Sequence, residues 1–93
     1  MIDDSFIKHA CEQVLRFSQA QSWDDLSEKI KAQLSFNLGV ATLGLNISKE
    51  ESFVPLAKLC QNKISILEFR EHFEKIIVAK GVYVDQELID RPF

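Results

Sequence analysis

The chain has 93 residues, 46% of them hydrophobic and 27% charged, with only three glycines and two prolines. A chain of this length has room for one hydrophobic core, and this composition can offset the entropy lost on folding, so we expect residues 1–93 to form a single domain. The net charge of −3 argues against nucleic acid and anionic membranes as partners, because both are bound through an excess of Lys and Arg.

The first predicted element is an amphipathic helix that begins at Asp3 or Asp4, either of which can cap it, and runs to about Gln19. Its apolar face is predicted to consist of Phe6, Ile7, Ala10, Cys11, Val14, Leu15 and Phe17. The other face is predicted to be exposed to water and consists of Lys8, Glu12, Gln13 and Arg16.

A second helix is predicted to start at Ser22-Trp23-Asp24-Asp25, an N-cap followed by first-turn carboxylates that suit the helix dipole. Its buried stripe would comprise Leu26, Ile30, Leu34 and Leu38, with Ala41 and Leu45 extending it. Residues 34–47 also fit a strand, because apolar residues alternate there with period two and two glycines weaken a helix. Helix is favoured, either straight or kinked at Gly39.

A third helix is predicted to start at Ser52 and to end near Gln61, because this start places Pro55 in the first turn, where proline is tolerated. A start at Ser48 would instead place Pro55 deep in the helix. The apolar side of this helix is predicted to consist of Val54, Leu56, Ala57, Leu59 and Cys60. Residues 62–63 form a turn.

The fourth predicted helix has explicit signals at both ends. Ser65 and Glu68 have the spacing of a capping box, Ile64 and Phe69 that of a hydrophobic staple, and Gly81 stands where a C-terminal cap is expected. The helix is predicted to pack through Leu67, Phe69, Phe73, Ile76 and Ile77.

These elements predict an all-α fold, a small four-helix bundle. The β-prone residues 82–84 have no hairpin partner, and Asp85 can cap a short extra C-terminal turn through Ile89. No apolar run approaches the ~20 residues that span a bilayer. The N-terminus is acidic where a secretory signal would be basic, so we expect a cytoplasmic protein without a membrane partner.

The sequence predicts no catalytic residue, no cofactor and no metal site. His9 and Cys11 stand two residues apart on a helix, so their side chains diverge by about 160° and cannot share a zinc ion with His72 and Cys60. The two cysteines stand among apolar neighbours in helical patterns, which predicts buried thiols. No nucleophile and base fall in a recognisable arrangement, and three scattered glycines cannot form a phosphate loop.

Acidic residues are the candidate partner-binding residues. Glu68, Glu71 and Glu74 follow each other at spacings of three, about 60° apart around the fourth helix, and so share one surface strip. The strip is either a solvated face, partly compensated by Lys75, or an acidic surface that meets a cationic groove. Its charge disfavours a DNA-reading helix-turn-helix. A second cluster comprises Asp24, Asp25 and Glu28, which the helix dipole explains in part.

Part of the chain, from Leu56 to Gly81, resembles the helical hairpin of the colicin D immunity proteins and related bacterial self-protective immunity proteins. The resemblance covers about thirty residues and rests on three short segments: Leu56-Ala57-Lys58-Leu59, Lys63-Ile64-Ser65 and Glu68-Phe69. The resemblance implies a small helical bundle that binds the nuclease domain of a toxin and blocks its active site with acidic side chains. It assigns no individual contact residue.

Two hypotheses for function follow. The first is a toxin-neutralising immunity protein whose acidic surface blocks a basic toxin domain, a nuclease by the resemblance, because a protein that grips nucleic acid must present cationic groups. The alternative is a non-catalytic adaptor or a self-assembling helical module. Neither hypothesis requires an active site.

Overall fold

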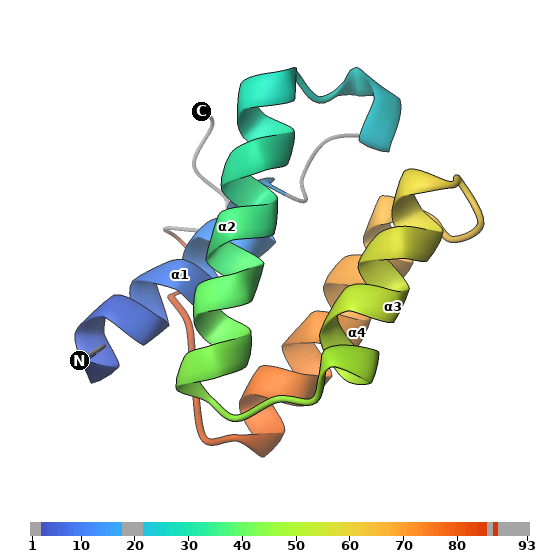
Figure 1. Cartoon of the computed structure of the whole chain (residues 1–93). Helices are drawn as coiled ribbons and strands as arrows, with labels where there is room; N and C mark the ends of the chain where they lie inside the picture. The colour runs from blue at the N-terminus through green and yellow to red at the C-terminus, as the bar shows by residue number, and fades with distance from the viewer. Residues whose placement is uncertain (1–2, 18–21, 86, 88–93) are drawn as a thin grey trace.

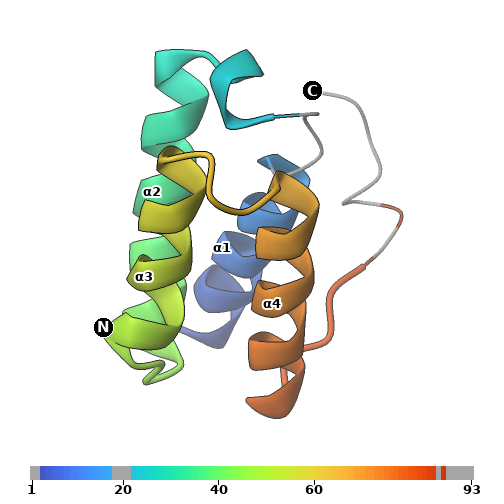
Figure 2. The same ribbon diagram turned by 90° about the vertical axis from the view of Figure 1, so that its right-hand side faces the viewer.

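The computed structural model describes residues 3–17, 22–85 and 87. Its elements are α1 (Asp4–Phe17), the short 3-10 helix η1 (Trp23–Asp25), α2 (Glu28–Gly44), α3 (Lys49–Cys60) and α4 (Ile66–Ala79). Helices α2 and α3 form the layer nearer the viewer in Figure 1, and α1 and α4 form the layer behind it, as the turned view in Figure 2 shows. The described residues contain no strand, and the predicted all-α four-helix bundle is confirmed.

The core lies between these two layers and draws on every helix. Helix α1 packs against α2 and α4, and α3 packs against α4 and more weakly against α2. The largest fully buried side chains are Cys11, Val14, Leu15, Leu34, Leu38, Leu59, Phe69, Phe73 and Ile77. At the end of α2 the backbone approaches α1 closely, because a Cβ atom on Gly44 would lie 2.6 Å from Ile7 Cγ1. A larger residue at position 44 would therefore have to displace the buried Ile7 side chain.

Helix α1 begins as predicted, since the Phe6 amide donates to Asp3 Oδ1 over 2.8 Å. The predicted apolar face is buried except for Phe6, which is 47% exposed, and Phe17, whose side chain lies outside the described residues, as do residues 18–19. The prediction that Glu12 faces water is wrong, because the chain after α4 folds back over this side of α1. The Asp85 amide there donates to Glu12 Oε2 over 3.5 Å, and only 8% of Glu12 is exposed.

The predicted start of the second helix at Ser22 is wrong. Residues 23–25 form η1 instead, Ser22 makes no side-chain cap, and Leu26 follows η1 with an extended backbone. Trp23 and Leu26 nevertheless both belong to the core. Helix α2 starts after Ser27, whose Oγ accepts from the Ile30 amide. It then continues through Gly39 to Gly44, so helix rather than strand is confirmed for residues 34–44.

Helix α3 starts three residues before the predicted Ser52, after an N-cap at Ser48. Pro55 is therefore inside the helix, where it lacks the amide that would donate to the Glu51 carbonyl. His72 of α4 compensates: its Nε2 lies 3.2 Å from Glu51 O and, as an N–H, donates to it. A side chain from the neighbouring helix thus satisfies the carbonyl that the proline leaves without an intrahelical partner.

The buried face of α3 also differs from the predicted one. Leu56 and Leu59 are buried as expected, but Val54, Ala57 and Cys60 are exposed. The buried residues follow the spacing i, i+4, i+7 from Ser52. Ser52 is 2% exposed, and its Oγ is hydrogen-bonded to Thr42 Oγ1 over 2.8 Å. This bond between α2 and α3 gives both buried hydroxyl groups a partner. Because Cys60 is exposed, the prediction that its thiol is buried is wrong, whereas the Cys11 thiol is buried as predicted.

Both predicted ends of α4 are confirmed. The Glu68 amide donates to Ser65 Oγ and the Ser65 amide to Glu68 Oε1, which completes the capping box. At the other end Gly81 has φ +85° and lies in a Schellman motif, in which its amide donates to Val78 O and the Val82 amide to Ile77 O. The predicted packing residues are buried or half-buried with the exception of Leu67, which is 58% exposed.

The residues after α4 pack against the bundle without forming a strand. Val82 and Val84 are half-buried against the core, whereas Tyr83 is exposed. The Glu87 amide donates to Asp85 Oδ1 over 3.0 Å, as expected for a capped turn. Residues 86, 88 and 89 of that turn, like residues 90–93, lie outside the described residues. In the part of the chain that the structure describes, no helix has the length and apolarity needed to cross a membrane.

Candidate protein-binding surface

The exposed side of α4 combines acidic and apolar side chains. Leu67, Glu71, Glu74 and Val78 lie within about 60° of one another around the helix, since each turn takes 3.6 residues. We call these four residues the α4 face. Leu67 is 58% and Val78 49% exposed. The face therefore carries carboxylates between two apolar side chains that the core does not use.

The three glutamates of the predicted strip are in different states. Glu68 is held in the capping box at the edge of the α4 face. Glu74 is half-buried and its Oε1 lies 3.4 Å from Arg70 Nε, an ion pair within one helix face. Glu71 is exposed, and among the described residues its carboxylate has no hydrogen-bond or ion-pair partner. Glu71 is thus the member of the strip that is free to meet a partner.

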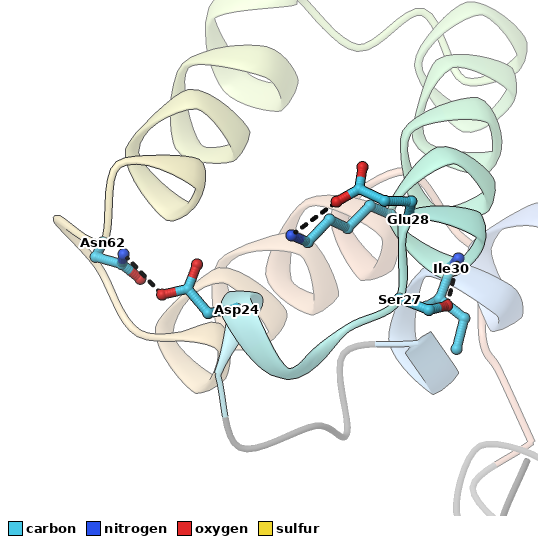
Figure 3. A network of polar contacts seen from close by, with 6 residues as sticks. Asp24, Ser27, Glu28, Ile30 and Asn62 are labelled. Atoms are coloured by element: carbon cyan, nitrogen blue, oxygen red, sulfur yellow. Dashed lines mark hydrogen bonds and ion pairs between the residues drawn. The ribbon is translucent and has the colours of Figure 1, made fainter.

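The second predicted cluster is divided as well. Figure 3 shows Asp24 pointing toward the α3–α4 turn, where its Oδ2 accepts from Asn62 Nδ2 over 3.2 Å. Glu28 Oε1 lies 3.5 Å from Lys31 Nζ, and that ammonium group also lies 5.4 Å from the centre of the Trp23 ring. Asp25 is exposed, and its side chain has no polar contact with the described residues.

The structure brings part of the two clusters to the same end of the bundle. A groove of about 400 Å³ lies between η1 and the start of α4, and Trp23, Asn62 and Glu68 are among the residues that line it. Asp24 adjoins this groove through its hydrogen bond to Asn62. Glu71 and Glu74 continue along α4 away from the groove, whereas Glu28 belongs to α2. Asp24 of the second cluster thus lies near Glu68, whereas Glu28 lies on a different helix from the strip.

Sequence reasoning missed the two apolar members of the α4 face. Leu67 was predicted to pack inward, and Val78 was not assigned to a surface. The buried residues of α4 follow the spacing i, i+3, i+7, i+11 in Ile66, Phe69, Phe73 and Ile77. Applied strictly, this spacing places Leu67 and Val78 outside the core stripe, so the signal was present in the sequence.

The cysteine thiols are poor nucleophiles in this structure. Burial, together with the negative charge of Glu12, raises the pKa of the Cys11 thiol to about 12. Burial also raises the pKa of the Cys60 thiol, although the charge of Lys31 acts in the opposite direction. Since the thiolate is the reactive form, neither thiol is activated. Within residues 3–17, 22–85 and 87, no three His, Cys, Asp or Glu side chains are grouped as metal ligands.

The described residues thus offer an acidic and partly apolar surface on one rigid helix, which suits contact with another protein. Comparison with protein-family models, curated proteins and solved structures gives no match for this chain.

Proposed function

We propose that this chain is a toxin-neutralising protein of the immunity type, which binds a basic toxin domain through the α4 face. We take the toxin domain to be a nuclease, because a nuclease presents cationic groups to its substrate. The observation that carries the proposal is the Glu71 carboxylate, which has no polar partner among the described residues and lies between the exposed side chains of Leu67 and Val78. The resemblance of residues 56–81 to the immunity proteins supports it, because that segment includes α4.

The chemistry of inhibition follows from these groups. A nuclease grips phosphates with cationic side chains, and a carboxylate on a rigid helix can occupy the same groove. The apolar neighbours of Glu71 exclude water when a partner closes over them, as the centre of a protein interface does. Glu68 and Asp24 extend the negative surface toward the groove beside Trp23. In this proposal the protein acts in the cytoplasm by binding alone, without catalysis, cofactor or metal ion.

The proposal makes a prediction for association kinetics. Glu71→Gln should slow association with the toxin domain severalfold and flatten its salt dependence, because charge at the contact steers encounter. Glu74→Gln should have a smaller effect, since Arg70 already neutralises much of that charge. Glu51→Gln is the matched control, because it removes one exposed charge from α3 instead. Rates are measured by stopped flow at low and high salt.

The partner for this experiment is obtained by co-purification from the native host, and its nuclease activity is assayed with and without an equimolar amount of the chain. We expect inhibition by the wild-type chain. A partner that has no toxin activity, or whose activity persists in an excess of the chain, would reject the proposed function. Equal rates for Glu71→Gln and Glu51→Gln would reject the α4 face as its site.

A second candidate function is the self-assembling helical module. It is favoured by a different observation, the exposure of Phe36 and Leu43 on the outer side of α2.

A further inference from the structure

Helix α2 is apolar on two opposite sides. Leu34, Leu38 and Ala41 are fully buried on the inner side. On the outer side, Phe36 is 66% and Leu43 78% exposed, and their separation of seven positions brings both side chains to within about 20° around the helix. No charged residue occurs between positions 32 and 46. The fold uses only the inner side, so the outer side is apolar without an intramolecular reason.

The outer side of α2 continues onto α3. A groove of about 330 Å³ between the two helices is lined by residues that include Gly39, Leu43 and Phe53. A shallow second groove, of about 460 Å³, adjoins it at Phe53 and is lined further by Val54 and Ala57. We call these residues and Phe36 the α2–α3 face. It belongs to the layer of helices nearer the viewer in Figure 1, which no other element covers on that side.

Gly39 lies at the middle of this face. A Cβ atom at Gly39 would meet no atom within 4 Å, and the residue does not have a positive φ. Glycine inside a helix is destabilising relative to alanine, and neither space nor backbone conformation requires it here, in contrast to Gly44. A glycine on an exposed apolar helix side permits the close approach of another backbone. Gly39 therefore leaves room for another helix to pack closely across α2.

We propose that a second copy of this chain covers the α2–α3 face in a two-fold symmetric dimer, with the two α2 helices antiparallel and crossing at Gly39. The face is complementary to itself in this arrangement. Phe36 and Leu43 stand on either side of Gly39, three residues before it and four after it. A two-fold axis at the glycine places Phe36 of each chain against Leu43 of the other, as an isologous interface requires.

The exposed area is also of the size that a dimer needs. The exposed fractions of Phe36, Leu43, Phe53 and Val54 correspond to roughly 400 Å² of apolar side-chain surface, given about 150–250 Å² for a large aromatic side chain. Since protein interfaces are about 57% apolar, this surface suits an interface of roughly 700 Å² per chain. Stable interfaces bury about 800 Å² per partner. The dimer does not use the α4 face, so it is independent of the proposed function.

The first test is the mass in solution, measured by light scattering on a size-exclusion column over a range of concentrations. The wild-type chain should have twice the monomer mass of 10.7 kDa. Leu43→Glu and Gly39→Gln should both be monomeric. Because glutamine favours helix more than glycine does, loss of the dimer in Gly39→Gln would not result from a weakened α2. Tyr83→Glu is the matched control, since Tyr83 is 72% exposed and lines neither groove of the face, and it should remain dimeric. Circular dichroism checks that each variant is folded.

The second test concerns orientation and uses engineered disulfides in a Cys60→Ser background. Positions 36 and 43 are about 10 Å apart along one helix, too far to bridge within a chain. The double variant Phe36→Cys/Leu43→Cys should therefore oxidise to a covalent dimer, and Phe36→Cys alone should not. A wild-type chain that stays at 10.7 kDa up to about 1 mM, where a dimer with a Kd of that size would be well populated, would overturn the proposal. A dimer that survives Leu43→Glu, or cross-linking by Phe36→Cys alone, would overturn the proposed interface.

Discussion

The two layers of the bundle differ in how far local sequence determines them. Helices α1 and α4 begin at the residues that their own side chains mark as caps, and α4 ends at the predicted glycine. In the other layer, α2 starts after Ser27 rather than Ser22, and α3 starts after Ser48 rather than at Ser52. The layer of α2 and α3 therefore depends more on contacts with the rest of the fold, and it also presents the larger unused apolar surface.

This difference shows that the same apolar residue type can either fill the core or stay exposed on the surface of one bundle. Helix α4 needs its apolar stripe for the core, and its exposed side carries Glu71 and Glu74 between Leu67 and Val78. Helix α2 has leucine on both sides, one buried and one exposed. A helix that is apolar all round is normally buried all round. The contrast can be tested by mutating matched residues in the two layers.

The largest expected effect separates the two sides of α2. Leu38→Ala should reduce the free energy of unfolding by about 2–5 kcal/mol, because Leu38 is fully buried and the substitution leaves a cavity. Leu43→Ala should change it by no more than about 0.5 kcal/mol, because Leu43 is 78% exposed in the single chain. Urea denaturation followed by circular dichroism, at protein concentrations that favour the monomer, measures both. Similar losses for the two variants would contradict the assignment of the sides.

An intermediate effect is expected from the contact between the layers at Pro55. Pro55→Ala restores the amide that donates to the Glu51 carbonyl, so it should stabilise the protein by about 1–3 kcal/mol, since proline inside a helix costs up to about 3 kcal/mol. His72→Ala should destabilise the wild-type chain by about 1 kcal/mol, the usual contribution of one hydrogen bond.

A double-mutant cycle decides whether His72 acts on the carbonyl that Pro55 leaves free. In the Pro55→Ala background, His72→Ala should cost less than in the wild type, because the restored amide then satisfies the Glu51 carbonyl. Additive effects of the two substitutions would show that the contact between His72 and Glu51 is independent of the proline.

The smallest expected effect compares two helix starts. Ser65→Ala should destabilise the protein by about 1 kcal/mol, because it removes one half of a reciprocal capping box. Ser27→Ala should cost about 0.5 kcal/mol, at the low end for N-caps, because Ser27 accepts a single bond from the Ile30 amide. Thermal unfolding of the two variants gives the comparison, and a larger cost at Ser27 would show that α2 relies on its own cap more than α4 does.

The sequence was sufficient for the fold class and for α4, because periodicity and capping act within about four residues of the chain. It misplaced the starts of α2 and α3, because two serines compete as caps in each region and tertiary contacts choose between them. Pro55 made a start at Ser48 look unfavourable, and the compensating donor His72 stands 21 residues away along the chain. The burial of Glu12 depends in the same way on Asp85, 73 residues later.

The candidate site was predictable in part. Helical spacing was enough to place Glu68, Glu71 and Glu74 on one surface, but not to show that a cap holds the first and Arg70 pairs with the third. Those states depend on side-chain geometry. The outer face of α2 was missed for a different reason: the predicted stripe of Leu34 and Leu38 leaves Phe36 on the opposite side, where a surface helix normally carries polar residues.

The Schellman motif at Gly81 has a consequence for where this domain can be shortened. It turns the chain back over the bundle, so that Val82 and Val84 cover the core and the Asp85 amide reaches Glu12. A fragment that stops at Gly81 would keep all four helices, yet it would uncover apolar core residues and leave an acidic side chain in α1 without its hydrogen-bond donor. Expression fragments and fusion partners are therefore better joined beyond residue 87 than at the end of the last helix.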